Sequence, residues 1–203
     1  MRPRRHVVVF MREPALGAVK HRLAAGIGDV AAWRFYRDTS RAVLRRLAAD
    51  RRWRTWIAAT PDGAAIAPPR DWRRVARVPQ GRGDLGVRMD RALRAFAPHP
   101  VVVVGSDIPG LAPRHVAAAF RALAAADIVF GPATDGGYWL VGARGAKRRH
   151  RAFAGVRWSG PYALSDSVGS LGRHVRIAYG PTLADVDDAA ALERRRAISG
   201  GAR

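Results

Sequence analysis

Short apolar runs alternate along the chain with longer segments in which apolar residues recur at helical spacing. The short runs are typical of strands that are buried on both faces of a parallel sheet. The strongest, residues 100–105, contains four consecutive valines, a residue type that favours strands. The pattern predicts strands at residues 6–11, 53–59, 75–78, 100–105, 127–130 and 175–179, with a further apolar stretch at 137–142.

The longer segments predict helices. Between residues 30 and 49, for example, Trp33, Tyr36 and Val43 lie near helical spacing. Strands that alternate with helices predict an α/β fold, in which helices cover both faces of a mostly parallel sheet to form a three-layer α/β/α sandwich. We expect a single domain over residues 1–203, with frayed ends at 1–5 and 199–203. The predicted helices are residues 30–49, 84–96, 113–126, 164–171 and 189–198.

The composition excludes several classes of protein. With 48% hydrophobic and 26% charged residues, the chain of 203 residues is typical of a globular protein. It contains no cysteine, which excludes disulfides, a thiolate nucleophile and a zinc site with cysteine ligands. No apolar run reaches the roughly 20 residues of a membrane span, and the first run is too short for a signal peptide. We therefore expect a cytoplasmic protein without a membrane span.

The formal net charge of +20 is unusual, and among the basic residues only Lys20 and Lys147 are lysines. Such a charge is typical of proteins that bind nucleic acid. The arginines are nevertheless dispersed over the whole chain, as expected from a general bias toward Arg and Ala. A polyanion partner remains the alternative, and in either case a basic field helps to gather a phosphate-bearing substrate. We expect no specific nucleic-acid partner.

Ligands of such sheets bind beyond the carboxyl ends of the strands, so the loops after the strands form the candidate site. The first loop, residues 11–23, has Pro14 and Gly17 to fix its turn, followed by Lys20 and Arg22. A glycine-containing loop at this place lets backbone N–H groups approach a phosphate. The choice of Lys20 in an arginine-rich chain indicates that a compact charge is needed. An ordinary solvated loop is the alternative, and the Walker sequence Gly-Lys-Ser/Thr is absent.

The second loop, residues 80–89, contains Gly81-x-Gly83-x-x-Gly86, which is the dinucleotide fingerprint, and the acidic Asp107 follows at about the expected distance. A nicotinamide or flavin site is therefore one hypothesis. Against it, the dinucleotide-binding unit normally opens its domain, whereas about 75 residues precede this loop. Asp107 also lies past the end of a strand, where we expect it to face a crevice rather than a ribose.

Carboxylates mark the third loop and the segment before the last helix. Asp107 follows the most buried predicted strand, a place where a carboxylate usually binds a hard cation together with phosphates. A turn or helix-cap aspartate is the alternative. The run Asp-Val-Asp-Asp at residues 185–188 puts three carboxylates into a strongly basic chain. Capping of the last helix explains one of them, and a second metal ligand explains another.

The fourth loop contains Asp135, two glycines and two aromatic residues. Gly136 and Gly137 allow a close approach between the backbone and a ligand. Tyr138 and Trp139 are suited to wall a sugar or a base. A plain Asp-Gly turn is the alternative.

In this order, the motifs resemble those of small bacterial proteins similar to nucleotide-diphospho-sugar transferases, often described as arsenosugar-biosynthesis-type glycosyltransferases. That family belongs to the GT-A-like superfamily, which includes molybdenum-cofactor and phospholactate guanylyltransferases. The resemblance covers about residues 6–195. His21 and Asp188 depart from the family pattern, which usually has Thr at both positions. The matching segments are residues 10–23, 80–89, 105–109, 131–142, 158–159 and 185–187.

The resemblance implies a GT-A-like, Rossmann-like fold and Mg²⁺- or Mn²⁺-dependent chemistry on an activated nucleotide. Asp107 and Asp187 would hold the metal, while Lys20 and Arg22 would neutralise the leaving diphosphate. Asp135 would bind the acceptor or take its proton, so the candidate catalytic residues are Lys20, Arg22 and Asp135. The implied nucleotide-binding residues are Pro14, Gly17, Lys20, Arg22, Gln80, Gly81, Gly83, Asp84, Arg88 and Ser106. The implied sugar or acceptor residues are Asp135, Gly136, Gly137, Tyr138, Trp139 and Trp158.

Three functions remain open at this point. Glycosyl transfer from a nucleotide sugar to a small-molecule acceptor is the preferred hypothesis. Nucleotidyl transfer from a nucleoside triphosphate, with release of pyrophosphate, is the alternative that uses the same metal. A non-catalytic protein that binds a nucleotide or nucleic acid is the third, although the intact motifs argue against it. Fold alone does not decide among them.

Overall fold

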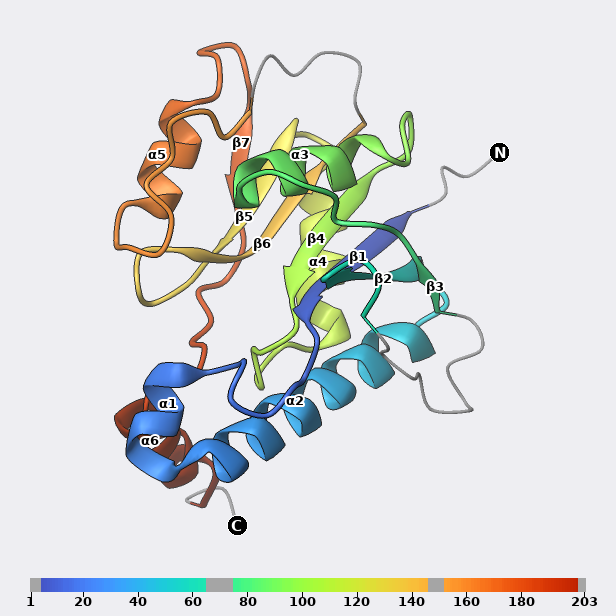
Figure 1. The fold of residues 1–203 in the computed structure, drawn as a ribbon. Helices are drawn as coiled ribbons and strands as arrows, with labels where there is room; N and C mark the ends of the chain where they lie inside the picture. The colour runs from blue at the N-terminus through green and yellow to red at the C-terminus, as the bar shows by residue number, and fades with distance from the viewer. Residues whose placement is uncertain (1–4, 65–74, 146–151, 201–203) are drawn as a thin grey trace.

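In the computed structural model, which describes residues 5–64, 75–145 and 152–200, seven strands form one sheet (Figure 1). They are β1 (His6–Arg12), β2 (Arg54–Thr60), β3 (Ala76–Arg77), β4 (Val101–Gly105), β5 (Ile128–Pro132), β6 (Tyr138–Ala143) and β7 (Ile177–Tyr179). Their order is β3-β2-β1-β4-β6-β5-β7. β6 runs antiparallel to its neighbours β4 and β5, and the other pairs are parallel. The predicted α/β fold with a mostly parallel sheet is confirmed.

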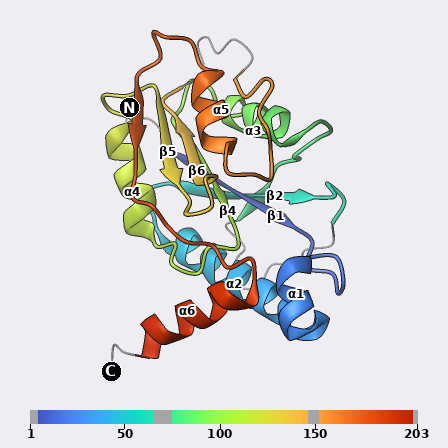
Figure 2. The same ribbon diagram turned by 90° about the vertical axis from the view of Figure 1, so that its left-hand side faces the viewer.

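Helices cover both faces of the sheet, as predicted. α2 (Asp29–Ala49) and α4 (Pro113–Ala122) share one apolar core with the sheet, and α3 (Leu85–Arg94) and α5 (Ala163–Gly169) share the other. Figure 2 shows α4 on one side of the strands and α3 and α5 on the opposite side. The central strands β1 and β4 are apolar at successive positions because both of their faces are buried.

A third, smaller core lies beyond the carboxyl end of β1. There α1 (His21–Ile27) and α6 (Ala189–Gly200) pack together and against the start of α2, at the lower end of Figure 1. Leu23 and Leu192 are buried between them. A Cβ atom added at Gly26 would lie 2.7 Å from the Cβ atom of Ala189, so the two helices approach closely because residue 26 has no side chain.

The predicted strands and long helices are present, with ends shifted by a few residues. The sequence analysis missed α1, which it assigned to the first loop. At the two ends of the described part, α6 continues to Gly200, and the Arg5 carbonyl accepts a hydrogen bond from the Arg54 N–H (2.8 Å). Residues 1–4 and 201–203 lie outside the described part. Within the described ranges, no helix combines the length and the apolar character needed to cross a membrane.

Candidate functional site

Charged residues from four segments meet at the carboxyl end of the sheet. Lys20 immediately precedes α1, Asp107 follows β4, and Asp135 lies between β5 and β6. Asp185 and Asp187 lie just before α6. The segment before α6 is joined to the end of β5, because the Leu183 N–H donates to the carbonyl of Pro132 (3.1 Å).

Lys20 forms the centre of this group. Its Nζ lies 2.8 Å from Oδ2 of Asp107 and 2.5 Å from Oδ1 of Asp187, and its side chain is only 5% exposed. Burial alone would lower the pKa of the ammonium, but the two carboxylates outweigh this effect and raise the pKa. The backbone of Lys20 is left-handed, with φ 53°, which is uncommon for a residue other than glycine. The bridge between the two aspartates therefore coincides with local backbone strain.

Three carboxylates form a second group beside Lys20. One oxygen from each of Asp135, Asp185 and Asp187 lies within 4.8 Å of the other two. Burial, together with the negative charges of Asp187 and Asp135, raises the pKa of Asp185 to about 6. Burial also acts to raise the pKa of Asp187, but Lys20 outweighs it and holds that pKa below its ordinary value. Oxygen donors with excess negative charge fit a hard divalent cation such as Mg²⁺ or Mn²⁺.

The structure groups the predicted aspartates differently from the sequence analysis. Asp107 and Asp187, the two expected metal ligands, both contact Lys20. Asp135 was expected on the acceptor side, and its carboxylate lies in the same group as Asp187. Asp185 was not among the predicted metal ligands. The Asp-x-Asp spacing at 185–187 was the available signal.

Asp188 caps α6, as expected for one of the three C-terminal carboxylates. Its Oδ1 accepts a hydrogen bond from the Ala191 N–H (2.8 Å). Its other oxygen lies 3.6 Å from an Nη atom of Arg22, whose side chain is largely exposed. Arg22 therefore lies at the exposed rim of the site, where its ion pair with Asp188 connects it to the start of α6.

The second loop is fixed mainly by contacts within the protein. The Gln80 side chain is buried and donates to the carbonyls of Ala58 (2.6 Å) and Met11 (3.3 Å), which ties the ends of β2 and β1 together. Its Oε1 accepts from Arg88 (2.9 Å). Asp84 caps α3 by accepting from the Val87 N–H (2.8 Å). These three predicted nucleotide-binding side chains thus shape the loop from within.

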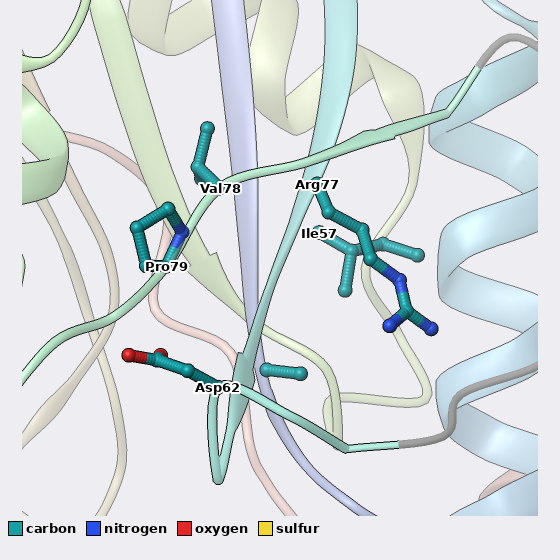
Figure 3. Close-up of a pocket in the computed structure, with 6 residues that line it drawn as sticks. Ile57, Asp62, Arg77, Val78 and Pro79 are labelled. Carbon is teal, nitrogen blue, oxygen red and sulfur yellow. The ribbon is translucent and has the colours of Figure 1, made fainter.

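A cavity of about 200 Å³ opens between the carboxyl ends of β2 and β3 (Figure 3). Its walls combine apolar side chains with one carboxylate and one guanidinium. The Asp62 carboxylate accepts from the backbone N–H groups of Gln80 (2.7 Å) and Gly81, and Arg77 donates to the Ala64 carbonyl (2.8 Å). Gly81 and Gly83 in the adjoining loop have positive φ angles, 74° and 112°, which a glycine tolerates. The lining residues are Ile57, Ala59, Asp62, Arg77, Val78 and Pro79.

The two aromatic residues of the fourth loop point to opposite faces of the sheet, because successive strand residues alternate. Trp139 is 4% exposed, belongs to the core beneath α2 and α4, and donates to the carbonyl of Pro181 (3.0 Å). Tyr138 packs on the other face, where its hydroxyl lies 3.1 Å from Oγ of Ser167. Trp158 is edge-on to Tyr138, with ring centroids 6.4 Å apart. The structure therefore places Trp139 in the core, away from the partners of Tyr138.

The two glycines of the fourth loop, Gly136 and Gly137, make different contacts. Gly136 has φ 86°, and a Cβ atom there would lie 2.2 Å from the carbonyl oxygen of Pro161. The Gly137 N–H donates to Oδ1 of Asp135 (2.9 Å). The loop is thus packed against the turn before α5. Asp135 therefore forms the Asp-Gly turn that was the alternative to a binding role, and it also belongs to the group of three carboxylates.

The first loop and the third are anchored from beneath. Among the predicted nucleotide-binding residues, Ser106 is buried, and the Pro14 carbonyl accepts from the indole N–H of Trp33 (2.6 Å). Gly17 has φ 71° and open space around its Cα. Backbone and side-chain contacts to α2 therefore hold this part of the site.

A family of bacterial proteins and several solved structures match the chain. The family described as "Uncharacterized protein conserved in bacteria (DUF2064)" matches residues 43–160. A protein from Desulfovibrio desulfuricans, provisionally described as a nucleotide-diphospho-sugar transferase, is 27% identical with a TM-score of 0.80, and the match covers 96% of each chain. No curated protein sequence matches the chain.

Two more distant structures share the fold. The synthetase of CMP:2-keto-3-deoxy-manno-octonic acid, complexed with CTP, is 13% identical with a TM-score of 0.54 over 98% of this chain and 99% of its own. Glucosyl-3-phosphoglycerate synthase from Mycobacterium tuberculosis, in complex with Mn²⁺, UDP and glucosyl-3-phosphoglycerate, is 15% identical with a TM-score of 0.50 over 98% and 76%. The expected likeness to the GT-A fold of nucleotide-sugar transferases is confirmed.

Proposed function

This chain belongs to the DUF2064 family, and on that premise we propose that it is a metal-dependent glycosyltransferase with a nucleotide-sugar donor. The observation that carries the proposal is Lys20, buried between Asp107 and Asp187 at the carboxyl end of the sheet. A positive charge enclosed by carboxylates suits a site where a metal and a diphosphate bind together. The 27% identity to a nucleotide-diphospho-sugar transferase of provisional description supports the choice of donor.

The three-carboxylate group is the proposed place of the metal. Asp135, Asp185 and Asp187 would hold Mg²⁺ or Mn²⁺, and Asp107 becomes available to it when Lys20 turns toward a phosphate. When bound, such a cation would neutralise charge on the diphosphate of the donor. The raised pKa of Asp185 supports this assignment, because burial and the negative charges of Asp187 and Asp135 disfavour its charged form, and a bound cation would offset that cost.

The diphosphate is proposed to lie over Lys20, with Arg22 at the rim. Both side chains would bind the oxygens that become negative as the sugar leaves, and they need not move a proton to do so. The nucleoside is proposed to lie in the cavity between β2 and β3. That cavity and the Asp107 loop are separated by about two and a half strand spacings, roughly 12 Å, which is enough for an extended nucleoside diphosphate.

The acceptor is proposed to approach from the fourth loop. Asp135 belongs to the carboxylate group and also to the turn that leads into Tyr138, so it joins the metal side of the site to the acceptor side. In this proposal its carboxylate also orients an acceptor hydroxyl. The packing of Gly136 against Pro161 and the bond from the Gly137 N–H to Asp135 hold this carboxylate in place for that role.

Nucleotidyl transfer is the second candidate, and the likeness to a synthetase bound to CTP favours it. In that reaction the nucleoside triphosphate releases pyrophosphate, and the same Lys20 and carboxylates would bind the departing group. The two reactions differ in their products, since glycosyl transfer releases a nucleoside diphosphate.

A thermal-shift screen tests the proposal. Nucleotide sugars and nucleoside triphosphates are each added with Mn²⁺, and a ligand at 100 times its dissociation constant adds about 2.7 kcal/mol of stability. We expect a nucleotide sugar to stabilise the protein in the presence of Mn²⁺ and not with chelator. A matching Asp187→Ala variant should lose the response. Absence of any shift with all nucleotides would contradict the proposal, and stabilisation by triphosphates alone, followed by pyrophosphate release, would favour the second candidate.

A further inference from the structure

A tyrosine hydroxyl lies beneath the site, at the junction of two loops. The Tyr36 side chain of α2 is buried, and its hydroxyl accepts from the Arg12 N–H (2.8 Å) and donates to the Arg12 carbonyl (3.0 Å). It also lies 3.3 Å from Oγ of Ser106, which accepts from the Ser40 hydroxyl (3.1 Å). One oxygen thus joins α2 to the ends of both β1 and β4.

The two ends that Tyr36 joins are those that carry the opposing charges of the site. Arg12 is the last residue of β1, and the chain runs from it through the first loop to Lys20. Ser106 directly precedes Asp107. Lys20 and Asp107 then face each other at 2.8 Å. The position of each partner in this ion pair therefore depends on a segment that Tyr36 fixes.

Neighbouring side chains of α2 reinforce the same contact. Trp33, Tyr36 and Ser40 follow one another at spacings of three and four residues, so they share one face of the helix. Trp33 donates to the carbonyl of Pro14 in the first loop (2.6 Å). Burial raises the pKa of Tyr36, which keeps its hydroxyl protonated and able to donate.

We infer that Tyr36 is a positioning residue, whose hydroxyl sets the separation between the loop of Lys20 and the loop of Asp107 for binding of a metal–diphosphate. This inference rests on the proposed function. Tyr36 contacts the backbone of Arg12 and the hydroxyl of Ser106, and it acts on the ligand only through the loops that they begin. Small displacements of a binding group are costly, so the expected effect is on affinity as well as on stability.

The test compares two variants that each remove one buried hydroxyl from the interface between α2 and the sheet. Tyr36→Phe removes the contact at the site. Thr55→Val removes the bond from the Thr55 hydroxyl to the carbonyl of Leu47 (3.0 Å), at the other end of α2. Positions 36 and 47 are eleven residues apart in the helix, which is about 17 Å along its axis. The control therefore removes the same kind of buried hydrogen bond from the same helix, but at a position distant from the site.

The probe is inorganic pyrophosphate with Mg²⁺, measured by calorimetry, because it does not depend on the identity of the base or sugar. We expect Tyr36→Phe to weaken its binding about tenfold or more, and Thr55→Val to change it less than about twofold, although both lower the melting temperature. Should Tyr36→Phe fail to fold, Ser106→Ala replaces it, and the same direction of change is expected. Equal affinities in wild type and in the folded site variant, or equal losses in both variants, would overturn the inference. Failure of the wild type to bind the probe would overturn the proposed function as well.

Discussion

At the scale of single residues, Lys20 supplies positive charge to carboxylates that also suit a divalent cation. Its ammonium contacts Asp107 at 2.8 Å and Asp187 at 2.5 Å. Asp187 belongs both to this pair and to the group with Asp135 and Asp185. A cation drawn to Asp187 therefore competes with Lys20, whereas a phosphate that attracts Lys20 releases the carboxylate.

Lys20→Met tests this competition, since methionine keeps an unbranched apolar stem and removes the charge. We expect the variant to bind Mg²⁺-pyrophosphate about tenfold more weakly, because the buried ammonium that we propose as the donor to the phosphate is lost. Mn²⁺ alone should bind several-fold more tightly than to wild type, because the carboxylates lose their internal counter-ion. Calorimetry measures both affinities.

The control for Lys20→Met is Arg22→Met, which removes a cation that lies at the exposed rim. It should reduce pyrophosphate affinity only slightly and leave binding of Mn²⁺ alone unchanged, because an exposed charge interacts weakly. Weaker binding of Mn²⁺ to Lys20→Met than to wild type would show that Lys20 does not compete with the cation.

Asp185 gives a prediction about pH in the metal-free protein. Its pKa of about 6 in the folded state lies above the ordinary value of 3.8, so the folded state binds the proton more tightly than the unfolded state. The contribution of Asp185 to the free energy of unfolding should therefore fall as the pH rises from about 4 to above 6. Asp185→Asn should remove that part of the pH dependence and stabilise the metal-free protein at pH 7.5 relative to wild type.

Urea unfolding with chelator present, at pH 4.5 and pH 7.5, measures the effect. The quantity compared is the change in unfolding free energy between the two pH values, for wild type and for Asp185→Asn. We expect the unfolding free energy of Asp185→Asn to fall less between pH 4.5 and pH 7.5 than that of wild type. The same loss in both proteins would mean that Asp185 ionises as readily in the folded state as in the unfolded state.

At the scale of elements, the long helices and buried strands could be predicted from the sequence because their apolar residues are periodic over many positions. α1 could not, since it has seven residues and follows a loop that contains Pro14 and Gly17. The antiparallel direction of β6 was equally hidden, because a strand buried on both faces has the same apolar run in either direction. Trp139 was misplaced for a related reason: the side of the sheet to which a residue points depends on where its strand begins.

Because α1 and α6 approach closely at Gly26, a substitution at this residue tests whether their contact stabilises the protein. In an open helix, replacing Gly by Ala stabilises by about 1 kcal/mol. At Gly26 the added Cβ atom would lie 2.7 Å from the Cβ atom of Ala189, so we expect Gly26→Ala to destabilise by about 1–3 kcal/mol instead. Lys20 precedes α1 and Asp187 precedes α6, so affinity for Mg²⁺-pyrophosphate should fall as well.

Gly169→Ala in α5 is the matched control, because the space around a Cβ atom at Gly169 is open. It should leave stability unchanged or raise it slightly, and it should leave pyrophosphate affinity unchanged. Denaturant unfolding gives the stabilities. A stabilised Gly26→Ala variant would indicate that α1 and α6 can separate without cost.

At the scale of the whole molecule, the meeting of the candidate loops at one edge of the sheet could be predicted, and their individual contacts could not. A parallel sheet brings the loops after its strands to one edge, so Lys20, Asp107 and Asp135 were expected near one another. Which carboxylates touch depends on how the chain returns along β5 to α6, a long-range contact that spacing does not reveal. Asp185 and the hydroxyl of Tyr36 were missed for this reason.

The net charge of +20 also belongs to the whole molecule. Several arginines lie over aromatic rings in separate elements, among them Arg37 over Trp33 in α2 and Arg54 over Trp56 in β2. Others pair with acids, as Arg157 does with Asp166 at 2.8 Å. These arginines therefore lie in separate elements. Proteins that recognise a nucleic-acid sequence instead gather their positive charge in one patch or groove.

Weak DNA binding without sequence preference is therefore the expected result. A protein that neutralises six or more phosphates loses about a thousandfold in affinity between 50 and 200 mM salt. Fluorescence anisotropy with two DNA duplexes of unrelated sequence should show equal affinities at 50 mM and very little binding at 200 mM. Pyrophosphate binding with Mg²⁺ should be far less sensitive to salt, because it uses few charges and the central one, Lys20, is buried. Tight binding of one duplex over the other at 200 mM would instead make nucleic acid a specific partner and overturn the enzyme interpretation of the basic surface.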